Sequence, residues 1–197
     1  MIPALSANLA VRYAWTAWIV SWLMAALWSS RAKRRPPRQT EAVYRLITVV
    51  GTVLLFGLGP ASGWTASRLW TAGTDVAWLL VVVTLLGFAF AWWARITLGR
   101  LWSSGVTVKA DHDMITAGPY RLVRHPIYSG ILLSVIATAV LFGTTAAAVG
   151  AVAIICGLYV KARIEEQFLR SELGDERYAS YARRVPMLVP FMRSSAP

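Results

Sequence analysis

Uncharged stretches that are long enough to cross a membrane alternate with charged stretches along the chain. Residues 13–30, 46–67 and 76–94 contain no charged side chain over 18, 22 and 19 positions. A helix of about 20 apolar residues spans a hydrocarbon core about 30 Å thick. We therefore expect three transmembrane helices in an N-terminal part, residues 1–94.

A fourth uncharged stretch covers residues 127–160, which is 34 positions. As a single helix it would be about 50 Å long at about 1.5 Å per residue, and this exceeds the thickness of a bilayer. We expect the stretch to reverse at Gly143, Thr144 and Thr145 and to form a short helical hairpin. A hairpin returns Lys161 to the membrane face on which the stretch began.

Polar segments flank this hairpin on both sides. Residues 95–124 are mixed in character and too long for a simple connector. Residues 163–184 have apolar positions at helical spacing, so we expect an amphipathic helix on the membrane surface, broken near Gly174. The apolar tail 185–191 is expected to pack on the protein. These elements predict an all-α integral membrane protein with about five transmembrane helices and a second part, residues 95–197, that carries the polar chemistry.

Composition and charge support a membrane protein and orient it. Of the 197 residues, 57% are hydrophobic and only 15% are charged. In the five-helix layout, 18 of the 20 lysines and arginines fall on one side of the membrane. Basic residues accumulate on the cytoplasmic side, so we expect the N-terminus outside and the C-terminus inside. The net charge of +11 does not indicate nucleic acid binding, because the basic residues border apolar runs.

Signatures of common soluble enzymes, such as a phosphate-binding glycine loop, paired cysteines or a zinc-protease helix, do not occur in the sequence. His112 and His125 are the only histidines, and Cys156 is the only cysteine. Because neither histidine has a thiol near it in the sequence, we expect no metal site.

The densest polar cluster beside an apolar run is formed by residues 117–130. Pro126 suits the first turn of a helix, which places His125 at or next to the N-cap. Amide groups exposed at such a helix start, with Arg124 beside them, favour the binding of an anion. This cluster is the strongest candidate for a functional site.

A known family shares this cluster and the charged segment after the hairpin. The run GPYRLVRHPIYSG, then Glu165 and Glu166, then GDERYASYARRVPMLVP, closely resembles the isoprenylcysteine carboxyl methyltransferase family of membrane enzymes. The resemblance covers roughly residues 95–190. It implies a methyltransferase that uses S-adenosylmethionine in a cytoplasmic cofactor pocket and takes a lipophilic substrate from the bilayer.

The resemblance also implies which residues form the site. The cofactor would be held by His112, Asp113, Met114, Ile115, Tyr120, His125, Pro126, Ile127 and Tyr128, with Glu165 closing the site. Side-chain chemistry adds Arg124 for the cofactor carboxylate and Glu166 as a second acid for its ammonium or ribose. Eukaryotic members have an arginine near the substrate carboxylate where this chain has Lys161, and Arg163 could replace it. The predicted catalytic residues are therefore Arg163, Lys161 and Glu165.

The acceptor of the methyl group stays open at the level of sequence. A carboxylate acceptor needs no general base, which agrees with the absence of a recognisable one. A methyltransferase of phospholipid amines would need His125 or Glu166 as a base. A membrane reductase that uses NADPH and a membrane protein without enzymatic activity are the alternatives from other classes. The arginine-rich composition and Lys161 favour a prokaryotic enzyme in the cytoplasmic membrane.

Overall fold

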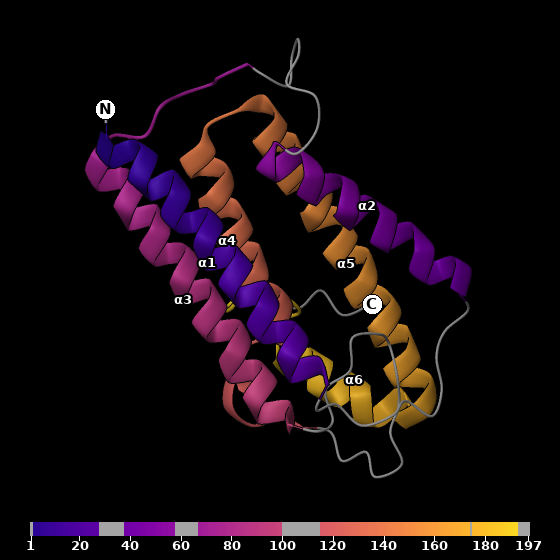
Figure 1. The fold of residues 1–197 in the computed structure, drawn as a ribbon. Coiled ribbons are helices and arrows are strands. Elements are labelled where there is room, and N and C mark those ends of the chain that lie inside the picture. The colour runs from indigo at the N-terminus through magenta and orange to yellow at the C-terminus, as the bar shows by residue number, and fades with distance from the viewer. Residues whose placement is uncertain (1, 28–37, 58–66, 100–114, 174, 193–197) are drawn as a thin grey trace.

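The structure is a computed structural model, and it describes residues 2–27, 38–57, 67–99, 115–173 and 175–192 (Figure 1). The elements in these ranges are helices, as the sequence predicts. They are α1 (Ile2–Ala26), α2 (Arg38–Phe56), α3 (Thr74–Leu98), the short 3-10 helix η3 (Gly118–Arg121), α4 (Pro126–Phe142), α5 (Thr145–Leu173) and α6 (Asp175–Arg184).

Helix α2 differs most from the first three predicted spans. It begins at Arg38, before the predicted start at residue 46, because Glu41 and Arg45 form an ion pair of 2.6 Å one helical turn apart. It ends at Phe56, and the next residue, Gly57, has a φ of +63°. This end agrees with the break that glycine at position 57 predicts within the uncharged stretch, and residues 58–66 lie outside the described part.

The long apolar stretch breaks where the sequence places the reversal. Helix α4 ends at Phe142, Gly143 adopts a left-handed conformation with φ +60°, and α5 begins at Thr145. The prediction of a separate surface helix over 163–184 is wrong in its first half, because α5 continues to Leu173 without interruption. The residues around Lys161 are good helix formers, so nothing there ends the helix. Only α6 is a separate charged helix.

The helices form two packed groups that meet at one end (Figure 1). Helix α3 packs along α4 and α1, whereas α2 packs along α5. Helices α4 and α5 converge at Gly143 and diverge toward their other ends, where α6 lies between them (Figure 1). The residues that precede α4 are thus close to the charged half of α5.

Glycines set the distance between the helices of each group. A Cβ atom on Gly130 of α4 would collide with the carbonyl oxygen of Gly87 on α3. A Cβ atom on Gly51 of α2 would lie 2.8 Å from the carbonyl oxygen of Gly150 on α5. Both helix pairs therefore pack backbone against backbone, as small residues allow in membranes.

The Gly130→Ala variant is expected to be less stable than the wild type by about 1–3 kcal/mol, because the added methyl group must push α3 and α4 apart. Thermal unfolding in detergent micelles measures the loss. Gly73→Ala is the matched control, since a Cβ atom there has no heavy atom within 4 Å. Equal unfolding temperatures for the two variants would contradict the close packing of α3 on α4.

The outer surface of the helices is apolar. Two helices, Thr74–Leu98 and Thr145–Ser171, are long and apolar enough to cross a membrane, and Pro126–Phe142 is a shorter apolar helix. Many large apolar side chains are exposed on these helices, among them Val76, Leu79, Leu86, Leu133, Ile136, Val152 and Val160. Such a surface suits lipid and not water. The full count of five spans stays a prediction.

Two arginines bind the C-terminal ends of helices at opposite ends of the molecule. Arg95 is buried and donates to the carbonyl oxygens of Ala25 on α1 (2.9 Å) and of Gly99, which follows α3 (2.7 Å). Arg12 donates to the carbonyl oxygen of Phe56 at the end of α2 (3.1 Å) and lies 4.8 Å from the ring centroid of Phe142 at the end of α4. Each positive charge faces the negative end of a helix dipole.

Candidate functional site

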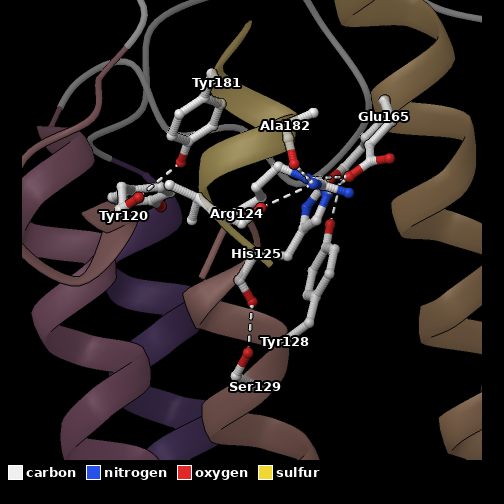
Figure 2. Close-up of polar contacts among 10 residues, drawn as sticks. Tyr120, Arg124, His125, Tyr128, Ser129, Glu165, Tyr181 and Ala182 are labelled. Atoms are coloured by element: carbon white, nitrogen blue, oxygen red, sulfur yellow. Dashed lines mark hydrogen bonds and ion pairs between the residues drawn. The ribbon is translucent and has the colours of Figure 1, made fainter. Parts of the chain in front are cut away.

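The start of α4 has the local structure that the sequence predicts. Pro126 is the first helical residue and His125 is the N-cap residue. The His125 side chain makes no capping hydrogen bond to the helix. It is therefore available to face α5, and this is where the polar side chains of the site meet (Figure 2).

A buried ion pair joins the start of α4 to α5. Arg124 Nε donates to Glu166 Oε1 at 2.6 Å, and both side chains are almost completely buried. The same guanidinium donates through Nη1 to the carbonyl oxygens of Ala182 and Val185, both at 2.8 Å (Figure 2). Arg124, which directly precedes α4, thus connects the end of α6 to both α4 and α5. This dense bonding gives Arg124 and Glu166 a role in the architecture of the site.

His125 lies between the two adjacent glutamates. Its Nδ1 atom is 3.4 Å from Glu165 Oε2, and its Nε2 atom is 3.4 Å from Glu166 Oε1. Burial opposes a charge on the imidazole, but the hydrogen bonds and charges of the two carboxylates outweigh it, so the pKa of His125 is raised. The protonated form is therefore favoured, and it is a poor general base.

Glu165 is the more accessible of the two carboxylates. Its side chain is 20% exposed, against 5% for Glu166. The Tyr128 hydroxyl donates a hydrogen bond to Glu165 Oε1 at 2.5 Å. The Tyr128 ring also stacks on the His125 ring, with the two ring centroids 5.4 Å apart. Lys161 Nζ lies 5.1 Å from the Tyr128 ring centroid. A carboxylate, an ammonium and two stacked rings therefore occupy one side of the junction between α4 and α5.

The segment after α6 crosses the start of α4 and holds it. The backbone amides of Arg124 and His125 donate to the carbonyl oxygens of Pro186 (2.9 Å) and Met187 (3.1 Å). Ser129 Oγ donates to the carbonyl oxygen of Leu188 at 2.5 Å. The predicted packing of the apolar tail is confirmed for these residues, and the bonds fix the backbone that carries the site.

Tyr120 joins the site to α6. The Tyr181 hydroxyl donates to the carbonyl oxygen of Tyr120 at 2.7 Å (Figure 2). Burial, with the negative charge of Glu165, raises the pKa of Tyr120 far above its ordinary value. Burial also raises the pKa of Tyr181, to about 12. Both phenols therefore stay protonated, and the Tyr181 hydroxyl acts as a hydrogen-bond donor.

The structure gathers most of the residues that the sequence selects. It brings together Arg124, His125, Tyr128, Lys161, Glu165 and Glu166. Pro126 and Ile127 are buried in the hydrophobic interior beside them, and Ile115 packs against it from the other side of η3. Arg163 is exposed on α5, away from these contacts. His112, Asp113 and Met114 lie outside the described residues.

One residue of the site could not be selected from the sequence. Tyr44 of α2 is buried, and its ring centroid lies 5.8 Å from Lys161 Nζ. The available signal was the pair Glu41 and Tyr44, a carboxylate and a phenol one helical turn apart just before an apolar run.

Within the ranges that the structure describes, no group of three or more histidines, cysteines and acids could hold a metal ion.

A comparison with known families gives this geometry a context. Residues 79–171 match the model of the isoprenylcysteine carboxyl methyltransferase (ICMT) family. The match covers a little under half of the chain, and over these residues the chain is similar to the family. It runs from α3 into α5, so it includes the junction of α4 and α5 but leaves out α1, α2 and α6.

Two individual proteins and one solved structure are similar to this chain. The Cobalt-zinc-cadmium resistance protein CzcN of Cupriavidus metallidurans is 33% identical over 78% of this chain and 64% of its own length. Protein-S-isoprenylcysteine O-methyltransferase B of Arabidopsis thaliana is 33% identical over 57% of this chain and 58% of its own length. The structure of a eukaryotic intramembrane Ras methyltransferase ICMT aligns with a TM-score of 0.56 and 25% identity, over 76% of this chain and 53% of that one. The chain thus spans about half to two thirds of the length of these relatives.

Proposed function

We propose that this protein is an S-adenosylmethionine-dependent methyltransferase that acts on a lipophilic acceptor, most simply a carboxylate of isoprenylcysteine type. The observation that carries the proposal is the joined cluster of His125, Tyr128 and Glu165 at the junction of α4 and α5. Similarity to the ICMT family, together with relatives that are named as methyltransferases, supports this reaction.

The side chains present fit the groups of S-adenosylmethionine. Glu165 is a partly exposed carboxylate that can accept hydrogen bonds from an ammonium or from ribose hydroxyls. His125 Nε2 is buried and interacts with Glu166 Oε1 at 3.4 Å without the geometry of a full hydrogen bond, so a ligand atom could compete for it. When bound, S-adenosylmethionine supplies an activated methyl group on a positively charged sulfur. The expected contacts from residues 112–114 lie outside the described residues and stay predictions.

The remaining roles belong to the acceptor side. The Lys161 ammonium can pair with the carboxylate of an acceptor, and Arg163 is exposed on a different part of the helix surface. The transfer would form a bond between an acceptor oxygen and the methyl carbon and would break the bond from that carbon to the sulfonium sulfur. S-adenosylhomocysteine would leave as a neutral thioether, so no proton has to move. A carboxylate is already a nucleophile at neutral pH, so alignment and removal of water are the main contributions of the protein. An amine acceptor would need a base, and the two carboxylates raise the pKa of His125, which makes it a weaker base candidate.

We place this site at the cytoplasmic face of a membrane, with the N-terminus outside. The distribution of basic residues supports this orientation, since 18 of the 20 lysines and arginines fall on the same side in a layout of five spans. The acceptor would then reach the site from the bilayer along the apolar surfaces of the long helices.

Separate titrations with S-adenosylhomocysteine and NADPH test the proposal against the reductase alternative. S-adenosylhomocysteine is expected to raise the unfolding temperature of the detergent-purified protein, since a ligand at 100 times its Kd stabilises the folded state by about 2.7 kcal/mol. NADPH is expected to leave the temperature unchanged. Greater stabilisation by NADPH would overturn the proposal in favour of a reductase.

A further inference from the structure

Tyr44 of α2 reaches the site although α2 lies outside the residues that match the family. The Tyr44 side chain is 4% exposed, and its ring centroid is 5.8 Å from Lys161 Nζ. The same ammonium is 5.1 Å from the ring of Tyr128. Lys161 therefore lies within cation–π distance of two tyrosine rings, one from α2 and one from α4.

The hydroxyl of Tyr44 can donate a hydrogen bond to a ligand. It is buried and has no hydrogen-bond partner among the described residues. The Arg45 side chain on the same helix is close enough to interact with this hydroxyl, but the two groups do not meet the geometry of a full hydrogen bond. Buried donors are nearly always satisfied in folded proteins, so an oxygen atom of a ligand would complete this position.

Close helix packing fixes Tyr44 at this place. A Cβ atom on Gly157 of α5 would lie 2.5 Å from Thr48 Oγ1 and 3.2 Å from the carbonyl oxygen of Tyr44. Gly157 is one helical turn before Lys161, so α2 is pressed against α5 beside the ammonium. The position of the Tyr44 ring thus depends on the backbones of two packed helices.

The carboxylates near Tyr44 and Lys161 already have positively charged partners. Glu41 pairs with Arg45 at 2.6 Å. Glu165 is 3.4 Å from His125 Nδ1 in addition to its interaction with Lys161. An incoming anion would therefore meet an ammonium and a hydroxyl donor, whereas an incoming amine would meet an ammonium of its own charge.

We propose that Tyr44 and Lys161 together bind the anionic head group of the acceptor, with the ammonium as its counter-ion and the Tyr44 hydroxyl as a hydrogen-bond donor. This inference rests on the proposed function and deepens it, because it assigns selection of an acidic acceptor to α2, outside the family match. Tyr44 is then a specificity-determining residue. Phospholipid amines are disfavoured by the same pair.

Binding of two synthetic ligands to the protein saturated with S-adenosylhomocysteine tests the inference. The first ligand is N-acetyl-S-farnesylcysteine, and the second is N-acetyl-S-farnesylcysteamine, which lacks the carboxyl group. In Tyr44→Phe, affinity for the acid is expected to fall about tenfold or more, because a hydrogen bond to a charged group is lost. Affinity for the cysteamine is expected to stay the same. Tyr159→Phe, a change at an exposed tyrosine of α5, is expected to affect neither ligand.

The other outcomes separate this inference from the proposed function. Equal affinity of wild type and Tyr44→Phe for the acid would overturn the role of Tyr44. So would a wild type that binds S-adenosylhomocysteine and the cysteamine but not the acid. A wild-type protein that fails to bind S-adenosylhomocysteine in the first titration would instead refute the proposed methyltransferase function. Lys161→Met is expected to weaken binding of the acid at least as much as Tyr44→Phe.

Discussion

Replacing Glu165 by glutamine is expected to weaken the binding of S-adenosylhomocysteine by about ten- to a hundredfold, the range for loss of a hydrogen bond to a charged group. Glutamine keeps the shape of the side chain but removes the charge that faces His125 and accepts the bond from Tyr128. Titration calorimetry on detergent-purified protein measures the change directly. A cationic ammonium or a ribose hydroxyl of the ligand would lose its best partner.

Glu176→Gln is the control for this experiment, because Glu176 is exposed on α6 and outside the site. It is expected to bind S-adenosylhomocysteine as the wild type does. If Glu165→Gln also bound with unchanged affinity, the ligand would not touch Glu165, and the cofactor would have to lie elsewhere in the protein.

Breaking the buried pair of Arg124 and Glu166 is expected to cost about 3–5 kcal/mol of stability, because either single change leaves the other charge buried. Arg124→Met also removes the bonds to Ala182 and Val185, so α6 loses its attachment. Glu166→Gln leaves those bonds in place and isolates the charge effect. Unfolding in detergent with each variant measures both losses.

A double variant separates the stability due to the Arg124–Glu166 interaction from the stability due to each side chain's other contacts. Arg124→Met combined with Glu166→Gln is expected to cost less than the sum of the single changes, because no charge is then left buried without its partner. Arg163→Met is the control, since Arg163 is exposed one helical turn before Glu166, and it should change stability by less than about 0.5 kcal/mol. Strict additivity of the two site changes would show that the pair contributes nothing as a pair.

Features that depend on neighbouring residues could be predicted from the sequence. Pro126 begins α4 because its fixed φ angle suits a first helical turn, and Gly143 ends it because glycine adopts a left-handed conformation at little cost. The location of the polar cluster could be predicted for the same reason, since Arg124 and His125 directly precede this helix. These signals act over a few residues and are visible in any single chain.

The family resemblance singled out Glu165, but the different partners of the two glutamates could not be predicted from the local sequence, because those partners are about 40 positions away. Glu165 and Glu166 are adjacent in sequence and chemically the same. On a helix they point about 100° apart, so one meets Tyr128 and the other meets Arg124. Only the packing of α4 against α5 decides which carboxylate is buried.

The contribution of α2 could not be predicted for a related reason. The uncharged stretch from which the span was predicted begins only at residue 46, whereas the helix already includes the charged pair of Glu41 and Arg45. Tyr44 then reaches the site because Gly157 permits a close approach between α2 and α5. A contact between helices more than 100 residues apart leaves no local pattern in one sequence.

The position of Arg12 changes how the charges of this chain should be counted. Arg12 is one of only two basic residues on the far side of the proposed layout, where it would oppose the preferred orientation during membrane insertion. Its guanidinium is bonded to the last carbonyl group of α2 and faces the ring of Phe142, so the folded protein needs a cation there. Arg12 is thus an exception that helix packing explains. On the opposite side Arg95 and Arg124 also bond to the ends of helices, so basic side chains at both membrane faces can stabilise the fold as well as orient it.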